Sequence, residues 1–218
     1  MPARLPIFPL ATVLVPGLVL PLHIFEPRYR QMIEQLLALP EGTTRQFGVI
    51  AVRNTSQPGE GPGDLHAVGC TAELREVTPY ADGRFDIVSV GETRFRLTGF
   101  DPDAGTPYHT GIVEFLPEDD GAGDLGRLAA RVTQLFAEYR RALGVEVTAL
   151  PDDPQVVSYL VAAAVVLHLP QRQALLERPT TADRLQTERE LLRREVALIK
   201  EFRALPGVEL TKGPVSSN

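Results

Sequence analysis

Hydrophobic residues change their spacing near residue 118, which predicts two structural halves. Before this point they occur in short runs and alternations broken by Gly, Pro and Asp, a pattern typical of β-strands. After it they recur at helical intervals, which is typical of amphipathic helices. We therefore expect an α+β protein with a β-rich part at 1–118, a helical part at 119–205 and a flexible tail at 206–218.

Short apolar segments in the first half predict strands separated by tight turns. These segments lie at 5–8, 12–15, 18–25, 47–52, 73–77 and 84–90. Asp82 and Gly83, between the last two, are a common pair in hairpin turns. Gly91 and Gly99 predict bulges or bends of the kind that let a sheet curve into a small barrel.

One helix is expected to interrupt this β-rich half. Pro27 suits its first position, because the backbone N–H that proline lacks has no partner at a helix start. Apolar residues follow at helical spacing, at Tyr29, Met32, Ile33, Leu36 and Leu37. Glu26, just before the helix, is close enough in sequence to pair with Arg28 or Arg30.

Capping signals divide the second half into a bundle of about four helices. An apolar stripe starts at Leu125 and ends at Gly144, a common helix C-cap. Asp153 and Pro154 form a start signal for a nearly all-apolar helix at 155–169.

Two further helices are expected after that apolar one. The first is a short helix at 170–177, which Pro179 closes. Thr180 and Asp183 then fit a capping box that opens a long helix reaching Phe202. This helix would turn Leu185, Leu192, Val196 and Ile199 inward.

Composition narrows the class of protein. The 218-residue chain has a formal charge of −6, and its basic residues are twenty Arg and two Lys, Lys200 and Lys212. A P-loop needs a Gly-Lys-Ser/Thr sequence, and neither lysine has those neighbours, so P-loop ATPase chemistry is excluded. Cys70 is the single cysteine, so no internal disulfide can form.

Two apolar stretches have the composition of export or membrane signals but not their other features. The first 25 residues contain five prolines, which break the helix that a signal peptide requires. The stretch at 156–169 is only about 14 residues, too short to span a bilayer. We therefore expect a soluble, cytoplasmic protein with no membrane partner.

Patterns for catalysis or metal binding are missing from the sequence. No serine lies in a G-x-S-x-G elbow, and the four histidines have no metal-binding spacing. Ser158, Cys70 and His168 are interpreted as buried core residues, and the acidic run at 118–120 as solvated linker charges. We expect no catalytic residue, no cofactor and no metal.

Several blocks of the sequence resemble the N-terminal, substrate-binding domain of Lon proteases. The first lie at 5–10 (LPIFPL), 13–17 (VLVPG) and 20–30 (LPLHIFEPRYR), and further matches follow at 47–50 (FGVI), 68–72 (VGCTA), 82–85 (DGRF) and 90–97 (VGETRFRL). Looser matches in the helical half lie at 158–160, 173–177 and 183–185, so the resemblance covers roughly residues 4–203.

This resemblance implies a PUA-like β pseudobarrel with one inserted helix, followed by a helical bundle. It also implies a non-catalytic domain that recognises proteins. Lon proteases carry an ATPase module and a peptidase module as well, and the sequence shows neither of them. The implied partners are unfolded or extended protein segments, with a protease complex as a further candidate. The candidate peptide-binding residues are Phe25, Arg28, Tyr29 and Phe95, although most of the motif is expected to determine the fold.

Three functions are compared on this basis. The first is a protein-binding module that uses an apolar groove between barrel and bundle, or an exposed strand edge. The second is an RNA-binding PUA-like module, with a basic stripe at Arg75, Arg84, Arg94 and Arg96. Nucleic acid is disfavoured because residues 1–118 hold nine Arg against fourteen Asp and Glu. The third is an unrecognised hydrolase or small-ligand enzyme. The oligomeric state stays open between a monomer and a weak dimer.

Overall fold

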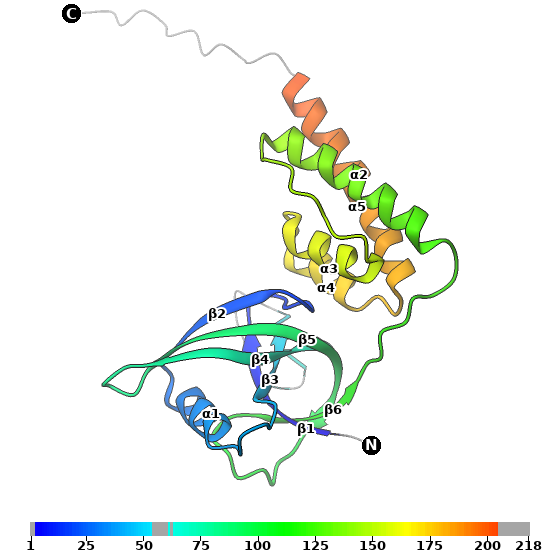
Figure 1. The fold of residues 1–218 in the computed structure, drawn as a ribbon. Helices are drawn as coiled ribbons and strands as arrows, with labels where there is room; N and C mark the ends of the chain where they lie inside the picture. The colour runs from blue at the N-terminus through cyan, green and yellow to red at the C-terminus, as the bar shows by residue number, and fades with distance from the viewer. Residues whose placement is uncertain (1–2, 54–60, 62, 205–218) are drawn as a thin grey trace, which may run out of the picture.

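The computed structural model describes residues 3–53, 61 and 63–204, so the tail expected at 206–218 lies outside the described residues. Within these ranges the strands are β1 (Ala3–Leu10), β2 (Val19–Ile24), β3 (Gln46–Ala51), β4 (Val68–Pro79), β5 (Phe85–Phe100) and β6 (Thr110–Phe115). The helices are α1 (Pro27–Leu37), α2 (Leu125–Leu143), α3 (Pro154–Ala164), α4 (Leu169–Leu176) and α5 (Thr181–Ala204). The α+β class is confirmed, with a strand-built body and a separate helical body (Figure 1).

The strands form one mixed sheet that closes on itself. Their order is β2-β5-β4-β3-β1-β6, and an additional pairing of β5 with β6 completes the barrel. The 16-residue strand β5 pairs with both terminal strands of the sheet. Its first part, Phe85–Val90, pairs with β2, and its last part, Phe95–Phe100, pairs with β6. Register shifts beside Gly91 and Gly99 confirm the expected irregularities and mark where β5 bends.

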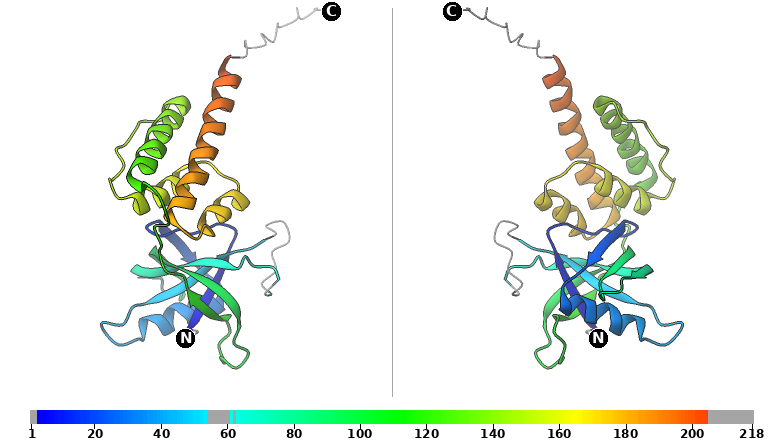
Figure 2. Two further views of the ribbon diagram at one scale, coloured as in Figure 1. Left: turned by 90° about the vertical axis from the view of Figure 1, so that its right-hand side faces the viewer. Right: turned by 90° about the vertical axis from the view of Figure 1, so that its left-hand side faces the viewer.

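Apolar side chains fill the barrel, and α1 covers one end of it. Phe47, Phe95 and Ile7 are completely buried. Tyr29 of α1 packs on Phe8, with ring centroids 4.1 Å apart. As Figures 1 and 2 show, α1 lies at the end of the barrel that faces away from the bundle.

The helical half follows its capping signals closely. The side chain of Asp153 accepts a hydrogen bond from the backbone N–H of Val156 at 2.9 Å, and α3 begins with Pro154. Thr180 Oγ1 accepts from the N–H of Asp183 at 3.1 Å and donates to that residue's carboxylate at 2.7 Å. Four helices therefore follow the barrel in the described ranges, and none of the described helices is long and apolar enough to cross a membrane.

The helix expected at 155–169 is wrong in its last third. Helix α3 ends at Ala164, Val165 is extended, and His168 is the exposed N-cap of α4 rather than a core residue. Pro170 explains the break, since a continuous helix would need the N–H that proline lacks, and the proline ring would clash with the carbonyl of Val166 four residues earlier.

The strand expected at 12–15 is also absent. Val13, Leu14 and Val15 lie in the connection between β1 and β2, and all three are buried. The turn at Gly17, whose φ is 79°, places its N–H 2.8 Å from the carbonyl oxygen of Gly91 on β5. The apolar run is therefore buried as a loop packed between the barrel and the bundle, not as a paired strand.

Glycine at position 69 is required by close packing inside the barrel. A Cβ at this position would lie 2.4 Å from the Val49 carbonyl oxygen and 2.6 Å from the Phe95 ring. We expect Gly69→Ala to lower the free energy of unfolding by about 2 kcal/mol or more, measured by urea denaturation. Gly99→Ala is the matched control, because a Cβ there meets nothing within 4 Å; equal losses in both variants would contradict this packing argument.

Candidate functional site

Glu118 joins the barrel to the bundle. It follows β6 in sequence, and its carboxylate accepts hydrogen bonds from side chains of both bodies. Arg94 of β5 donates through Nε at 2.8 Å, Tyr159 of α3 donates through its hydroxyl at 2.8 Å, and Arg184 of α5 donates through Nη2 at 3.3 Å. We call Arg94, Glu118, Tyr159 and Arg184 the junction network.

Arg94 also holds the end of α4 against the barrel. Its Nη1 donates to the carbonyl oxygens of Leu176 at 3.0 Å and Arg178 at 2.6 Å. These carbonyls lie at the C-terminal end of α4, where the helix dipole favours a positive charge. Because the Arg94 side chain is only 2% exposed, this contact fixes how the bundle sits on the barrel.

Arg184 is enclosed on the bundle side of the same network. Its guanidinium lies 3.8 Å from the centroid of the Tyr159 ring, and its Nε donates to the Ser158 hydroxyl at 2.8 Å. Ser158 in turn donates to the carbonyl of Gln155 at 2.7 Å, which confirms it as a core serine. Burial raises the pKa of Tyr159, so its hydroxyl stays protonated and remains a donor.

The interpretation of Glu118 as a solvated linker charge is wrong. The placement of Arg94 in a surface stripe of basic residues is wrong too, because Arg94 and its neighbour Phe95 are both buried. Phe95 points into the barrel, whereas Arg94 lies under the bundle, so each face of the strand is covered by a different body. No local sequence signal reveals that cover, because it comes from segments more than 80 residues away.

Cys70 is a buried, free cysteine, as expected. Burial raises the pKa of its thiol, so the thiolate form that would act as a nucleophile is suppressed. Among the described residues, no group of three His, Cys, Asp or Glu side chains is arranged to hold a metal ion. In the junction network the carboxylate of Glu118 accepts three hydrogen bonds from side chains of both bodies, an arrangement that stabilises the structure.

An apolar groove opens beside the junction network. It has a volume of about 350 Å³, and its walls come from both bodies. The barrel contributes the turn at Pro16 and Gly17 and part of β5, and the bundle contributes α3. Val156 and Leu160 of α3 are 44% and 37% exposed, and both line this groove. We call this the junction groove.

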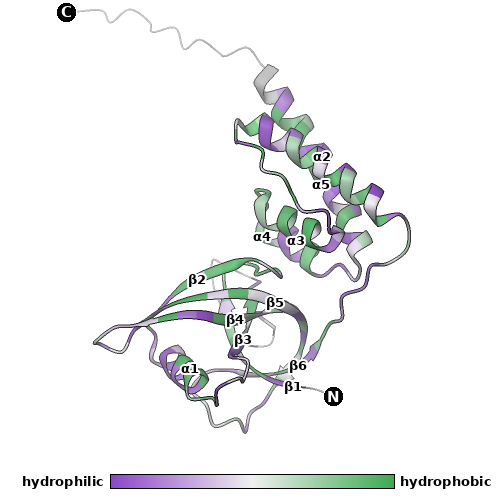
Figure 3. Ribbon diagram, viewed as in Figure 1, coloured by the Kyte–Doolittle hydropathy of each residue, from purple (hydrophilic) through white to green (hydrophobic). Residues whose placement is uncertain are grey.

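Strand β2 lies next to the junction groove and is an edge of the sheet. It pairs with β5 on one side and stands at the end of the strand order. Val19, at its start, is 56% exposed, and Phe25, just after its end, is 61% exposed. Figure 3 shows hydrophobic colouring along β2 and on α3, the two elements that flank this part of the molecule.

The four candidate peptide-binding residues fall into two pairs. Phe25 and Arg28 lie at the surface near the end of β2, where Arg28 pairs with Glu26 at 2.8 Å. Tyr29 and Phe95 are buried in the barrel core, at 4% and 0% exposure. Direct contact with a peptide therefore stays a prediction for the first pair, and the second pair supports the fold from inside. Sequence reasoning missed Val156 and Leu160, because their positions read as part of a buried helix.

The basic stripe suggested for RNA does not form a free surface. Arg94 is buried in the junction network, Arg75 pairs with Glu92 at 2.6 Å, and Arg84 pairs with Asp82 at 2.8 Å. Within the described ranges, Arg96 is the member of the set that is exposed without an ion pair. An Arg94→Ala variant would therefore disturb the junction and cannot test RNA binding.

The closed barrel, the appended bundle and the junction between them define an α+β domain of the barrel-plus-bundle class. Residues 4–194 match the family described as the substrate-binding domain of ATP-dependent protease La (LON). The chain belongs to this family.

Curated relatives of the chain are Lon proteases, in agreement with the family match. The chain is similar to Lon protease 2 of Syntrophobacter fumaroxidans (29% identity over 85% of this chain and 24% of the relative) and to Lon protease 2 of Myxococcus xanthus (26% identity over 92% of this chain and 24% of the relative). It thus spans about a quarter of these relatives' length.

Two solved structures have the same fold. One is the Lon N-terminal domain protein from Xanthomonas campestris, with a TM-score of 0.62, 24% identity, and coverage of 88% of this chain and 98% of that chain. The other is the N-terminal domain of Mycobacterium avium complex Lon protease, with a TM-score of 0.64, 18% identity, and coverage of 89% and 98%. They confirm the expected fold.

Removing the Glu118 carboxylate should weaken the attachment of the bundle to the barrel and so lower the free energy of unfolding. Glu118→Ala would leave Arg94 and Arg184 buried without their counter-ion, so we expect a loss of about 3 kcal/mol in the free energy of unfolding. Urea denaturation measures this loss. Asp120→Ala is the control, since Asp120 is an exposed carboxylate in the same acidic run; an equal effect in both variants would show that the network contributes nothing.

Glu188 on α5 predicts an unusual pH dependence. It is 1% exposed, it lies beside Leu175 and Leu192, and neither of its carboxyl oxygens has a hydrogen-bond partner among the described residues. Burial raises its pKa well above the usual range, against an opposing effect of the Arg184 charge. The folded chain therefore holds a proton that the unfolded chain releases above about pH 4.3, and stability falls as pH rises beyond that value.

Glu188→Gln should remove this dependence. We expect the variant to be more stable than the wild type at pH 8, and to differ little from it at pH 4, where both states of the wild type are protonated. Thermal unfolding followed by circular dichroism measures the difference, and each kcal/mol corresponds to roughly 2–4 °C in Tm for a chain of this size. Glu190→Gln, an exposed neighbour, should show no such gain. A variant less stable than the wild type at pH 8 would contradict the protonation argument.

Proposed function

We propose that this chain is a non-catalytic substrate-recognition module that binds unfolded or extended protein segments. The observation that carries the proposal is the junction groove, whose apolar wall on α3 stays exposed although both bodies contribute to the site. Its volume of about 350 Å³ falls within the ~300–1,000 Å³ typical of binding clefts.

An extended apolar segment fits the chemistry of this groove. Val156 and Leu160 lie one helical turn apart on α3 and supply an apolar wall. Folded proteins bury such residues, so the partner that gains most from this wall is a chain that has its own apolar side chains exposed. Glu92, on the opposite wall, supplies the polar rim that limits nonspecific association.

The free edge of β2 extends the same site. The turn at Gly17 leads from the groove directly into β2, and Val19 and Phe25 are exposed at the two ends of this strand. An extended peptide can pair its backbone with an exposed strand edge while apolar side chains supply specificity. In this arrangement Phe25 and Arg28 contact the distal part of the bound segment.

Family membership supports a place in ATP-dependent proteolysis, alongside a protease complex, and we propose that the chain acts there in the cytoplasm. The relatives named Lon protease are about four times longer than the region they share with this chain, so recognition is the part of the process that we assign to it.

The test is binding of a permanently unfolded, carboxymethylated model protein to the full chain, followed by fluorescence anisotropy. We expect Val156→Asp and Leu160→Asp each to weaken binding roughly tenfold, because each removes apolar contact and buries a charge. Val166→Asp is the matched control, since Val166 is 78% exposed on the α3–α4 connection and does not line the groove.

Two results would overturn this proposal. The first is equal binding by the two groove variants and the control. The second is a failure of the unfolded protein to bind, together with tight binding of an RNA oligonucleotide at low salt, which would favour the RNA-binding alternative.

A further inference from the structure

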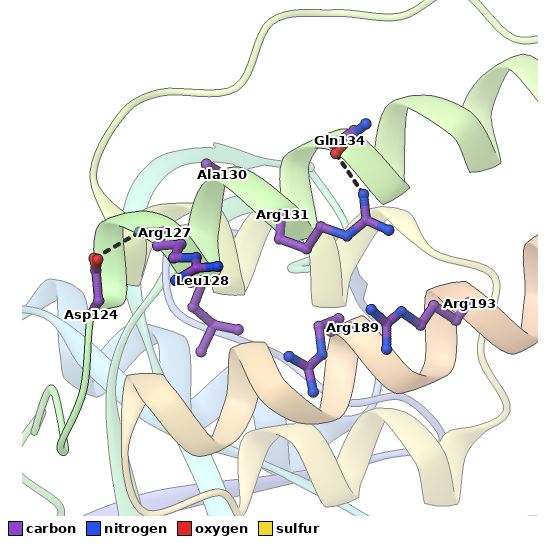
Figure 4. Close-up of a pocket in the computed structure, with 8 residues that line it drawn as sticks. All are labelled: Asp124, Arg127, Leu128, Ala130, Arg131, Gln134, Arg189 and Arg193. Atoms are coloured by element: carbon purple, nitrogen blue, oxygen red, sulfur yellow. Dashed lines mark hydrogen bonds between the residues drawn. The ribbon is translucent and has the colours of Figure 1, made fainter.

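A second groove, of about 550 Å³, lies between α2 and α5 and shares no lining residue with the junction groove (Figure 4). Four arginines line it. Arg127 and Arg131 come from α2, and Arg189 and Arg193 come from α5. Figure 4 shows the two α5 side chains on the side of α5 that faces α2, which carries the other pair. We call this the arginine groove.

These four arginines lack the ion pairs that other arginines of the chain make. Arg4, Arg28, Arg75, Arg84 and Arg94 each contact a carboxylate within 3 Å. In the described part of the chain, none of the four groove arginines does so. Arg131 donates to the neutral amide of Gln134 at 2.6 Å, and the Nε of Arg189 is buried without an acceptor.

The carboxylate on the groove's lining is already used. Asp124 is the N-cap of α2, and its Oδ1 accepts from the backbone N–H of Arg127 at 2.9 Å. It therefore satisfies the helix end and, in the described part of the chain, forms no ion pair with the groove arginines, so one carboxylate stands against four guanidinium charges on this lining.

The positions of these charges are unfavourable for the helices themselves. Arg127 lies in the first turn of α2, where the helix dipole disfavours a positive charge and where the N-cap Asp124 is the acidic residue. Arg127 and Arg131 are four residues apart, as are Arg189 and Arg193, and like charges at this spacing repel one another. A bound anion relieves both effects.

We propose that the arginine groove binds an acidic segment of a partner protein, one that presents at least two Asp or Glu carboxylates. The planar guanidinium fork matches a carboxylate through two parallel hydrogen bonds. Leu128 and Ala130, also on the lining, provide an apolar surface for the aliphatic carbons of the segment. This site goes beyond the proposed function and does not depend on it.

Charge elsewhere in the chain favours an acidic peptide over a nucleic acid. A nucleic acid extends its phosphates far past a groove of this size and needs a basic track along its path. The chain as a whole carries −6, and its first 118 residues hold nine Arg against fourteen Asp and Glu. A short acidic segment engages the four arginines and avoids that repulsion.

The test uses a fluorescein-labelled eight-residue peptide of alternating Glu and Ser, and anisotropy with the full chain. We expect the double variant Arg127→Gln with Arg193→Gln to bind at least about tenfold more weakly, since two exposed charge contacts are lost. The control double variant, Arg96→Gln with Arg194→Gln, removes the same charge from exposed positions outside the groove and should bind as the wild type does. Circular dichroism confirms that each variant is folded.

Further arms of the experiment separate recognition of carboxylates from nonspecific association. The corresponding Gln-Ser peptide should not bind, and added salt should weaken binding of the acidic one. Equal binding by the Gln-Ser peptide, an unchanged affinity in the groove variant, or an equal loss in the control variant would each overturn the proposal. Tighter binding of an eight-nucleotide oligo-dT than of the acidic peptide would overturn it in favour of a nucleic acid.

Discussion

The position of the bundle on the barrel depends on one carboxylate, that of Glu118. It pairs with two buried arginines, Arg94 from the barrel and Arg184 from the bundle, and it accepts a third hydrogen bond from Tyr159. A buried arginine without a counter-ion is strongly unfavourable, so neither body can leave the other without exposing or stranding a charge. The apolar contacts around Val15, Val68 and Leu176 then complete the interface.

The junction groove is a consequence of this docking. One wall belongs to the barrel and the other to α3, so the groove exists in neither body separately. The same network fixes α3 through Tyr159, which also lines the groove. Because the junction network holds the two bodies together, the spacing of the groove walls is set before any partner binds. Such preorganisation lowers the entropic cost of binding.

Arginine has two distinct uses in this chain, which has only two lysines. In the junction, planar guanidinium groups bridge carbonyls, a carboxylate and an aromatic ring, which a lysine ammonium does not match. Between α2 and α5, four arginines face a groove without carboxylate partners among the described residues. In the first use the guanidinium groups are held by partners inside the protein, whereas in the second they leave charge available to an external ligand.

Local signals in the sequence determined most of the elements: the helix starting at Pro27, the caps at Asp153 and Thr180, and the bends at Gly91 and Gly99. These signals could be read from the sequence because prolines, glycines and capping residues determine the backbone conformation within a few residues of themselves. The resemblance to the family then correctly predicted that the elements form a barrel and a bundle. Only the tertiary structure decided the role of Glu118, the burial of the loop at 12–15 and both grooves. These features depend on which distant segment covers a residue, and that information is absent from the pattern around the residue itself.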